Sequence, residues 1–212
     1  SAKHAGRGQY RFFDPEMNRA AADWLEVGAE LHHALERDEF ELHYQPKVNL
    51  GSGAITGVEA LIRWRSPDLG LVPPNKFIPI LEETGLILEV GDWVIARAGR
   101  QARLWQEQGL PPMRIAVNLS PRQFQQRDLA QRIRVLIDQP DFKPEYLELE
   151  ITESMVMQNV ERAIAMLEEL RQIGVRVAID DFGTGYSSLA VLKRFPVDCL
   201  KVDRSFVRDI PD

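Results

Sequence analysis

The sequence predicts an α/β fold in which a largely parallel sheet closes toward a TIM-like (β/α)8 barrel. Two observations lead to this prediction. Strand-like runs alternate with helical patterns along the 212-residue chain, which is typical of parallel sheets. Most of these runs also alternate between an apolar face and a face that ends in polar side chains. Helices can cover only the apolar face, so the polar face is expected to line an enclosed interior, as in a barrel.

The expected elements follow from hydrophobic periodicity. Residues 1–22 have no sustained period and are predicted to be a linker or tail, whereas residues 23–212 are predicted to form one domain that opens with a helix from Trp24. The clearest later helix lies at 159–174, where Gly174 is placed to end it, and a second lies at 128–139. The predicted strands are residues 40–48, 57–64, 114–120, 146–152, 175–181 and 199–203.

The composition excludes several classes of function. A formal net charge of -6 argues against a broad surface for a DNA or RNA polymer. No apolar stretch approaches the roughly 18 residues of a membrane span, so we expect no membrane contact from this segment. The single cysteine, Cys199, excludes an internal disulfide and a multi-cysteine zinc site. It favours a cytoplasmic location, which leaves open a membrane anchor elsewhere in a longer protein.

Polar residues lie at or near the ends of five predicted strands, on the face opposite the apolar one. In a barrel these ends meet at one mouth, where functional groups gather. The five residues are far apart in sequence, and the later ones are separated by about one strand–helix unit each. We therefore expect them to converge. They are Glu59, Asn118, Glu150, Asp180 and Lys201.

The convergent oxygens, together with those of Asp181, are ligands that select Mg²⁺, Mn²⁺ or Ca²⁺. Crowded carboxylates also repel one another unless cations neutralise them. The two adjacent aspartates, Asp180 and Asp181, allow one to bridge two ions while the other binds the second, and a two-metal site suits in-line phosphoryl chemistry. Lys201 would orient or help to deprotonate the attacking water. Arg63, on the face of Glu59, could contact a phosphate.

Each of these residues, taken alone, has an ordinary alternative. The run DDFGTG at 180–185 is acceptable turn chemistry, and Glu59 could be a solvated strand end. Lys201 could be a surface lysine and Arg63 an ion-pair partner. By strict alternation Asp181 points outward, so metal binding requires the strand to end between Asp180 and Asp181, with the glycines at 183 and 185 permitting a turn.

Several motifs in order resemble the EAL domain family, the cyclic dimeric GMP (c-di-GMP) phosphodiesterases. The resemblance covers about residues 26 to 210, and residues 2–13, AKHAGRGQYRFF, resemble the tail of an upstream GGDEF cyclase domain. The motifs are EALIRW at 59–64, YQPKV at 44–48, FIPILEETGLI at 77–87, VNLSPRQF at 117–124, LELEITES at 147–154, AIDDFGTGYSSL at 178–189 and LKVDRSFV at 200–207.

This resemblance implies an EAL-type barrel that hydrolyses c-di-GMP to the linear dinucleotide pGpG with two Mg²⁺ or Mn²⁺ ions. It implies a homodimer that forms through the 181–189 loop region, with Glu153 bracing that loop. By motif position, the first metal would be held by Glu59, Asn118, Glu150 and Asp180, the second by Asp180 and Asp181, the attacking water would contact Lys201, and the dinucleotide would contact Gln45, Leu61 and Arg63.

The family pattern continues past RDIPD for about two more strand–helix units, which carry a further metal-binding glutamate and a glutamine near the substrate. The six predicted strands likewise fall short of the eight of a barrel. If the polypeptide ended at residue 212, we would expect a weakened second metal site and little activity.

Two other functions compete with the phosphodiesterase. The first is a non-catalytic c-di-GMP receptor, although such relatives usually lose metal ligands and this sequence keeps each one that it spans. The second is a metal-dependent barrel lyase with Lys201 as its base. The EAL and DDFGTG runs, and the lack of a second basic residue at a mouth position, argue against the lyase.

Overall fold

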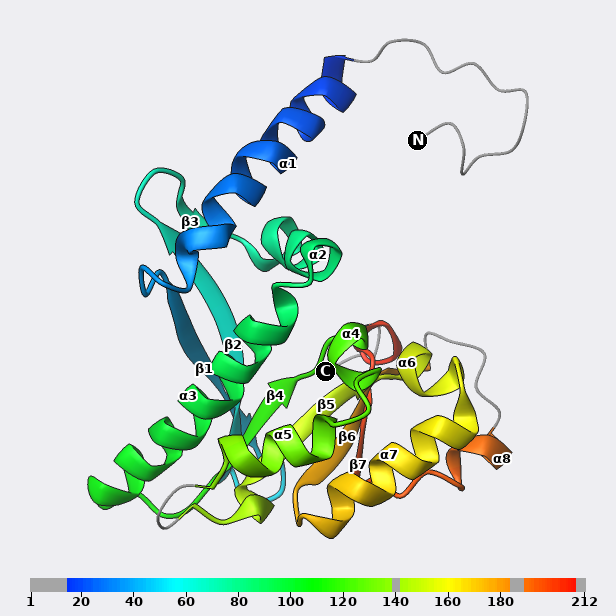
Figure 1. Ribbon diagram of the computed structural model, residues 1–212. Helices are drawn as coiled ribbons and strands as arrows, with labels where there is room; N and C mark the ends of the chain where they lie inside the picture. The colour runs from blue at the N-terminus through cyan, green and yellow to red at the C-terminus, as the bar shows by residue number, and fades with distance from the viewer. Residues whose placement is uncertain (1–14, 139–141, 184–188, 209–212) are drawn as a thin grey trace.

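The computed structural model describes residues 15–138, 142–183 and 189–208, and these form one seven-stranded sheet with helices packed against it (Figure 1). The hydrogen-bonded order is β1-β2-β4-β5-β6-β7, with β3 paired to β2. The strands are β1 (Phe40–Val48), β2 (Ile55–Ser66), β3 (Gly70–Val72), β4 (Arg114–Asn118), β5 (Leu147–Thr152), β6 (Arg176–Phe182) and β7 (Cys199–Val202).

The mostly parallel α/β fold is confirmed. The pairs from β2–β4 to β6–β7 are parallel, and all six predicted strands are present. Only β1–β2 and β2–β3 are antiparallel among the described pairs, because short turns join them and a parallel pair requires a long crossover. The sequence analysis missed β3, whose three residues are too few to show a period.

The helices are α1 (Pro15–Ala34), α2 (Pro74–Thr84), α3 (Ile87–Glu107), α4 (Pro121–Phe124), α5 (Leu129–Leu136), α6 (Glu153–Met157), α7 (Val160–Gln172) and α8 (Leu189–Leu192). Three of them, α3, α5 and α7, lie side by side over the strands (Figure 1). The predicted helix end at Gly174 is confirmed, since this residue follows α7 with a φ of 88°.

The start of the first helix was predicted too late. The helix α1 begins at Pro15, inside the stretch predicted to be a linker. Proline is favoured at a first helical position, and the run of three alanines at 20–22 has the highest helix propensity. This part of the helix shows no hydrophobic period, so the period alone could not reveal it.

The alternation of the two strand faces is also confirmed. Apolar side chains such as Ile115, Leu149 and Val177 are almost fully buried in the core beneath the helices. On the opposite face Glu148 and Glu150 are buried as well, with exposed fractions of 5% and 1%. Burying carboxylates is costly unless they are paired with cations, so this enclosed polar face must contain charge partners.

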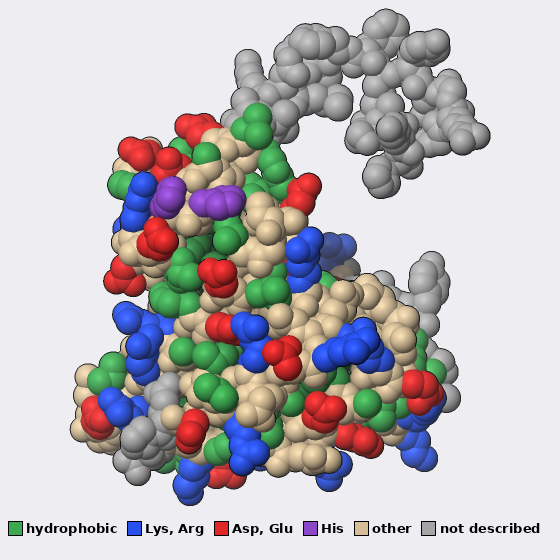
Figure 2. Space-filling view, in the orientation of Figure 1, with side chains coloured by type: hydrophobic (Ala, Val, Ile, Leu, Met, Phe, Trp, Pro, Cys, Tyr) green, Lys and Arg blue, Asp and Glu red, His purple; other side chains and the backbone are tan. Residues whose placement is uncertain are grey.

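The outer surface carries mixed charge. On the face shown in Figure 2, Lys and Arg side chains are interspersed with Asp and Glu, without one large basic patch. Within the described residues, none of the helices combines the length and the apolar character required to cross a membrane.

Candidate active site

The five polar residues predicted to converge do so around the ammonium group of Lys201. Its Nζ lies 2.5 Å from Glu150 Oε2, 2.8 Å from Asp180 Oδ2 and 3.3 Å from Glu59 Oε2. The amide Nδ2 of Asn118 donates to Glu59 Oε1 at 2.8 Å. The strands β2, β4, β5, β6 and β7 thus each contribute one side chain to a single cluster. Parallel pairing brings their equivalent ends together, as the barrel interpretation requires.

A second charged layer lies beside this cluster, and the sequence analysis missed it. Lys47 of β1 donates to Glu148 Oε1 and to Glu150 Oε1, at 2.7 Å each. Arg114 lies 3.8 Å from Glu148 Oε2. The available signal was that Glu148 lies two residues before Glu150 and therefore shares its face. The cation that faces it could not be inferred, because β1 is not a sheet neighbour of β5.

The electrostatics of the cluster follow from burial and pairing. Burial raises the pKa of Glu150, and the hydrogen bonds from Lys201 and Lys47 only partly oppose this. For Lys201 burial lowers the pKa, but hydrogen bonds to Asp180 and Glu150 outweigh it, so the net pKa is raised. In this arrangement Lys201 keeps its proton at neutral pH. It can therefore orient a water or an anionic oxygen, but it cannot take up a proton.

The strand β6 does not end between its two aspartates, which was the condition stated above for metal binding by Asp181. It continues to Phe182, and the change in direction comes from Asp181 itself, which has a φ of 51°. The pairing register with β7 shifts between Ile179 and Phe182, as at a β-bulge. Burial, followed by the charges of Asp180 and Asp203, raises the pKa of Asp181. Asp181 therefore experiences the field of the same carboxylate cluster.

The residue predicted to brace the following loop contacts the end of this bend. Glu153, with an exposed fraction of 3%, accepts a hydrogen bond from the backbone N of Gly183 at 2.8 Å. Gly183 has a φ of 100°, and a Cβ there would lie 2.6 Å from Phe206. Gly185 and most of the predicted 181–189 dimer loop lie outside the described residues.

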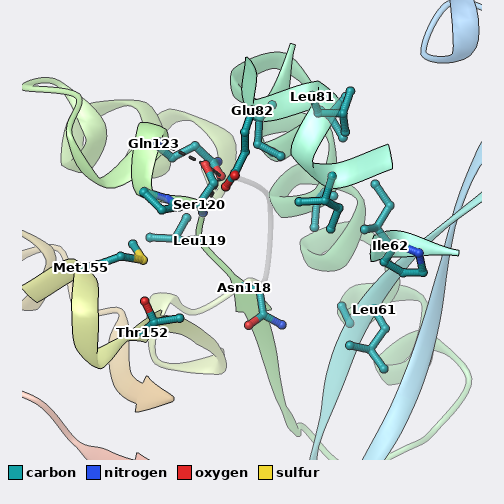
Figure 3. Close-up of a pocket in the computed structure, with 18 of the residues that line it drawn as sticks. Leu61, Ile62, Leu81, Glu82, Asn118, Leu119, Ser120, Gln123, Thr152 and Met155 are labelled. Carbon is teal, nitrogen blue, oxygen red and sulfur yellow. Dashed lines mark hydrogen bonds between the residues drawn. The ribbon is translucent and has the colours of Figure 1, made fainter. Parts of the chain in front are cut away.

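Two of the three predicted substrate residues line a mostly apolar cavity of about 300 Å³, drawn in Figure 3. Leu61 and Arg63 come from β2, and Arg63 Nη1 donates to the backbone oxygen of Ile62 at 2.8 Å. Asn118 lines the same cavity, so its amide links this space to Glu59. An apolar cavity next to convergent polar groups is the usual form of a small-molecule site.

The third substrate residue, Gln45, lies in a different space. It pairs with Glu59 in the β1–β2 register and lines a second cavity of about 310 Å³, whose charged lining residues include Lys47, Glu148 and Lys201. The structure therefore places Gln45 in the cavity lined by Lys47, Glu148 and Lys201. It places Leu61 and Arg63 in the apolar cavity.

The segment after Asn118 is fixed by a capping box. The Ser120 side chain accepts from Gln123 N, and the Gln123 side chain accepts from Ser120 N. The helix α3 packs closely on this turn at Gly91, where an added Cβ would lie 2.0 Å from Gln123 Nε2. A glycine is thus required for the close approach that shapes one wall of the apolar cavity.

The donor chemistry of the cluster fits a hard divalent cation. Three carboxylates converge within 3.3 Å of one positively charged atom, and the Asn118 side chain, whose amide nitrogen contacts Glu59, carries an amide oxygen as a further potential ligand. As they stand, the described His, Cys, Asp and Glu side chains include no group of three or more placed to hold a metal ion. In this arrangement Lys201 Nζ lies at the point where the carboxylates meet.

Comparisons with known proteins identify the family to which this chain belongs. The model of the EAL domain matches residues 29–212. The bifunctional diguanylate cyclase/cyclic di-GMP phosphodiesterase MucR of Pseudomonas aeruginosa is 46% identical over 209 residues, which cover 99% of this chain and 30% of MucR. The cyclic di-GMP phosphodiesterase PdeR of Escherichia coli is 42% identical over 210 residues, which cover 99% of this chain and 32% of PdeR.

A solved structure is similar as well. The structure described as the PaMucR phosphodiesterase in complex with c-di-GMP superposes with a TM-score of 0.83 at 46% identity, covering 87% of this chain and 74% of that one. The chain spans about a third of the length of the two curated relatives, at 30% and 32%.

Proposed function

Because the chain belongs to the EAL domain family, we propose that it is a c-di-GMP phosphodiesterase that releases linear pGpG with the help of two Mg²⁺ or Mn²⁺ ions. One observation carries the proposal: Glu59, Glu150 and Asp180 converge on Lys201 beside the cavity that contains Leu61 and Arg63. PdeR is named as a phosphodiesterase of this substrate, and the PaMucR structure is described as its complex.

In this proposal the metal ligands come from the observed cluster. Glu59, Asn118, Glu150 and Asp180 would hold one ion, and Asp180 with Asp181 would hold the other. When bound, the ions would neutralise the carboxylates and supply an activated water together with charge stabilisation at the phosphate. The net reaction adds the water oxygen to phosphorus and breaks one P–O3′ bond, which leaves a 5′-phosphate and a free 3′-hydroxyl.

The remaining residues would bind and orient the substrate. Arg63 would pair with a phosphate oxygen, and Leu61 would offer apolar contact to a guanine base at the cavity wall. Gln45, opposite Glu59, would contact the dinucleotide from the cavity that it lines with Lys47 and Glu148. Lys201 would remain an ammonium that orients the attacking water through its own hydrogen bonds. Glu153 would keep the bend after Asp181 in place through Gly183.

We further propose that the chain acts in the cytoplasm as one domain of a longer signalling protein. Residues 1–22 would connect it to a GGDEF or sensor domain, and the 181–189 loop region would form a homodimer. Two facts support the placement within a longer signalling protein. The name of MucR includes a cyclase activity, and this chain spans 30% of MucR.

A turnover assay tests the function. The chain, and any longer natural polypeptide that contains it, is incubated with c-di-GMP and either Mg²⁺ or Mn²⁺, and pGpG is separated by liquid chromatography. We expect product that disappears when EDTA removes the metal. If neither polypeptide forms product but both still bind c-di-GMP in calorimetry, the receptor function replaces the enzyme.

A further inference from the structure

We propose that Lys47 is a positioning residue that fixes the carboxylate of Glu150 for cation binding. The inference deepens the proposed function and rests on it, because it assigns a role toward the metal ions proposed there. Lys47 is not among the polar residues predicted at the mouth. It enters through two contacts that cross the polar interior.

The carboxylate of Glu150 is held from two sides. Lys47 Nζ binds its Oε1 at 2.7 Å, and Lys201 Nζ binds its Oε2 at 2.5 Å. The Glu150 side chain is 0% exposed, so water cannot replace either partner. These two contacts fix the carboxylate plane, and they leave Oε2 on the Lys201 Nζ that Glu59 and Asp180 also contact.

The fold directs Lys47 to this place. Its strand β1 is separated from β5 by β2 and β4, so the contact reaches across the interior instead of along the sheet. The β1–β2 register shifts between Lys47 and Val48. Such a bulge re-aims side chains and is often found beside active sites.

A second carboxylate holds Lys47 itself. Glu148, with 7% of its side chain exposed, accepts from the same Nζ at 2.7 Å, while Arg114 lies on its other oxygen at 3.8 Å. Without Lys47, two buried carboxylates would face each other in a medium of low polarity. The two carboxylates would repel each other, Glu150 would turn away, and its orientation toward Glu59 and Asp180 would be lost.

Binding of Mn²⁺ to the 212-residue chain tests the proposal, with free Mn²⁺ measured by electron paramagnetic resonance. In the K47M variant we expect the Kd for Mn²⁺ to rise by about 10- to 100-fold, the usual effect of losing a partner of a metal ligand. K47R, which keeps the charge, should recover most of the affinity. K76M is the matched control, because Lys76 is exposed on α2, outside the strands that supply the cluster.

A Kd of K47M within twofold of the parent would overturn the proposal, and tighter binding would do so too, because it would mean that Lys47 merely competes with the cation. If K47M alone does not fold, the K47M/E148Q variant is used instead. It removes the charge of Glu148 together with that of Lys47, so that Glu150 no longer faces a second carboxylate. Weak Mn²⁺ binding by this folded variant supports the role of Lys47, and parent-like binding refutes it. A parent chain that binds no Mn²⁺ refutes the proposed metal function itself, and the role of Lys47 with it.

Discussion

The replacement of Lys201 by methionine is the most informative single change, because one ammonium balances three carboxylates. In the absence of metal, K201M leaves Glu59, Glu150 and Asp180 without their shared cation. Methionine is unbranched like lysine and only one heavy atom shorter, so packing changes little. We therefore expect a loss of stability that comes from charge and that a divalent cation can reverse.

The remaining contacts set the size of this loss. Glu150 keeps Lys47, Glu59 keeps the amide of Asn118, and Asp180 keeps the backbone N of Asp181 at 2.9 Å. Each carboxylate thus retains one partner. The cost should lie below the roughly 3–5 kcal/mol for stripping a buried charge of its partner, at about 2–3 kcal/mol. A metal at about 100 times its Kd contributes about 2.7 kcal/mol, which is enough to offset it.

Urea unfolding followed by circular dichroism measures the effect, once with EDTA and once with excess Mn²⁺. K76M serves as the control for loss of a lysine. We expect K201M to be less stable than K76M in EDTA and to recover in Mn²⁺. If the two variants unfold within about 0.5 kcal/mol of each other in EDTA, Lys201 does not balance the carboxylates and the reasoning fails.

Three further changes test other parts of the site. D180N should lower turnover of c-di-GMP by at least about 100-fold with an unchanged circular dichroism spectrum, and near-normal turnover would remove Asp180 from the metal site. E153A should speed hydrogen exchange at the Gly183 amide, which loses its 2.8 Å acceptor; unchanged exchange would mean that Glu153 does not hold the bend. G91A should lower the free energy of unfolding by about 1–3 kcal/mol in a thermal melt, because its Cβ would lie 2.0 Å from Gln123 Nε2; full stability would show that Gln123 can move aside.

The sequence could predict those parts of the site that depend on local pattern. Alternation within each strand places Glu150 opposite Leu149, and the rule that parallel strand ends meet places Glu150 near Glu59 and Asp180. Neither step requires knowledge of a particular contact. For this reason five residues from five strands could be assigned to one cluster before their distances were known.

What the sequence could not predict depends on how the sheet curves. The contact from Lys47 to Glu150 joins strands that are not neighbours, so no pairing rule reports it. The same holds for Gly91. A small residue is favoured there because α3 packs against the Gln123 side chain of the capping box. Short or non-periodic elements, such as β3 and the beginning of α1, also lack the signal on which the predictions were based.

The two aspartates of β6 lie where the regular alternation of side chains along the strand is interrupted. Regular pleating would send Asp181 to the helix side, away from Asp180. Instead Asp181 adopts a φ of 51°, a conformation that aspartate tolerates better than most residues, and the register with β7 shifts at the same point. Glu153 and Gly183 hold the far side of this bend. In the proposed function, this strained residue is what would allow the two adjacent carboxylates to act on the same ions, which regular alternation would separate.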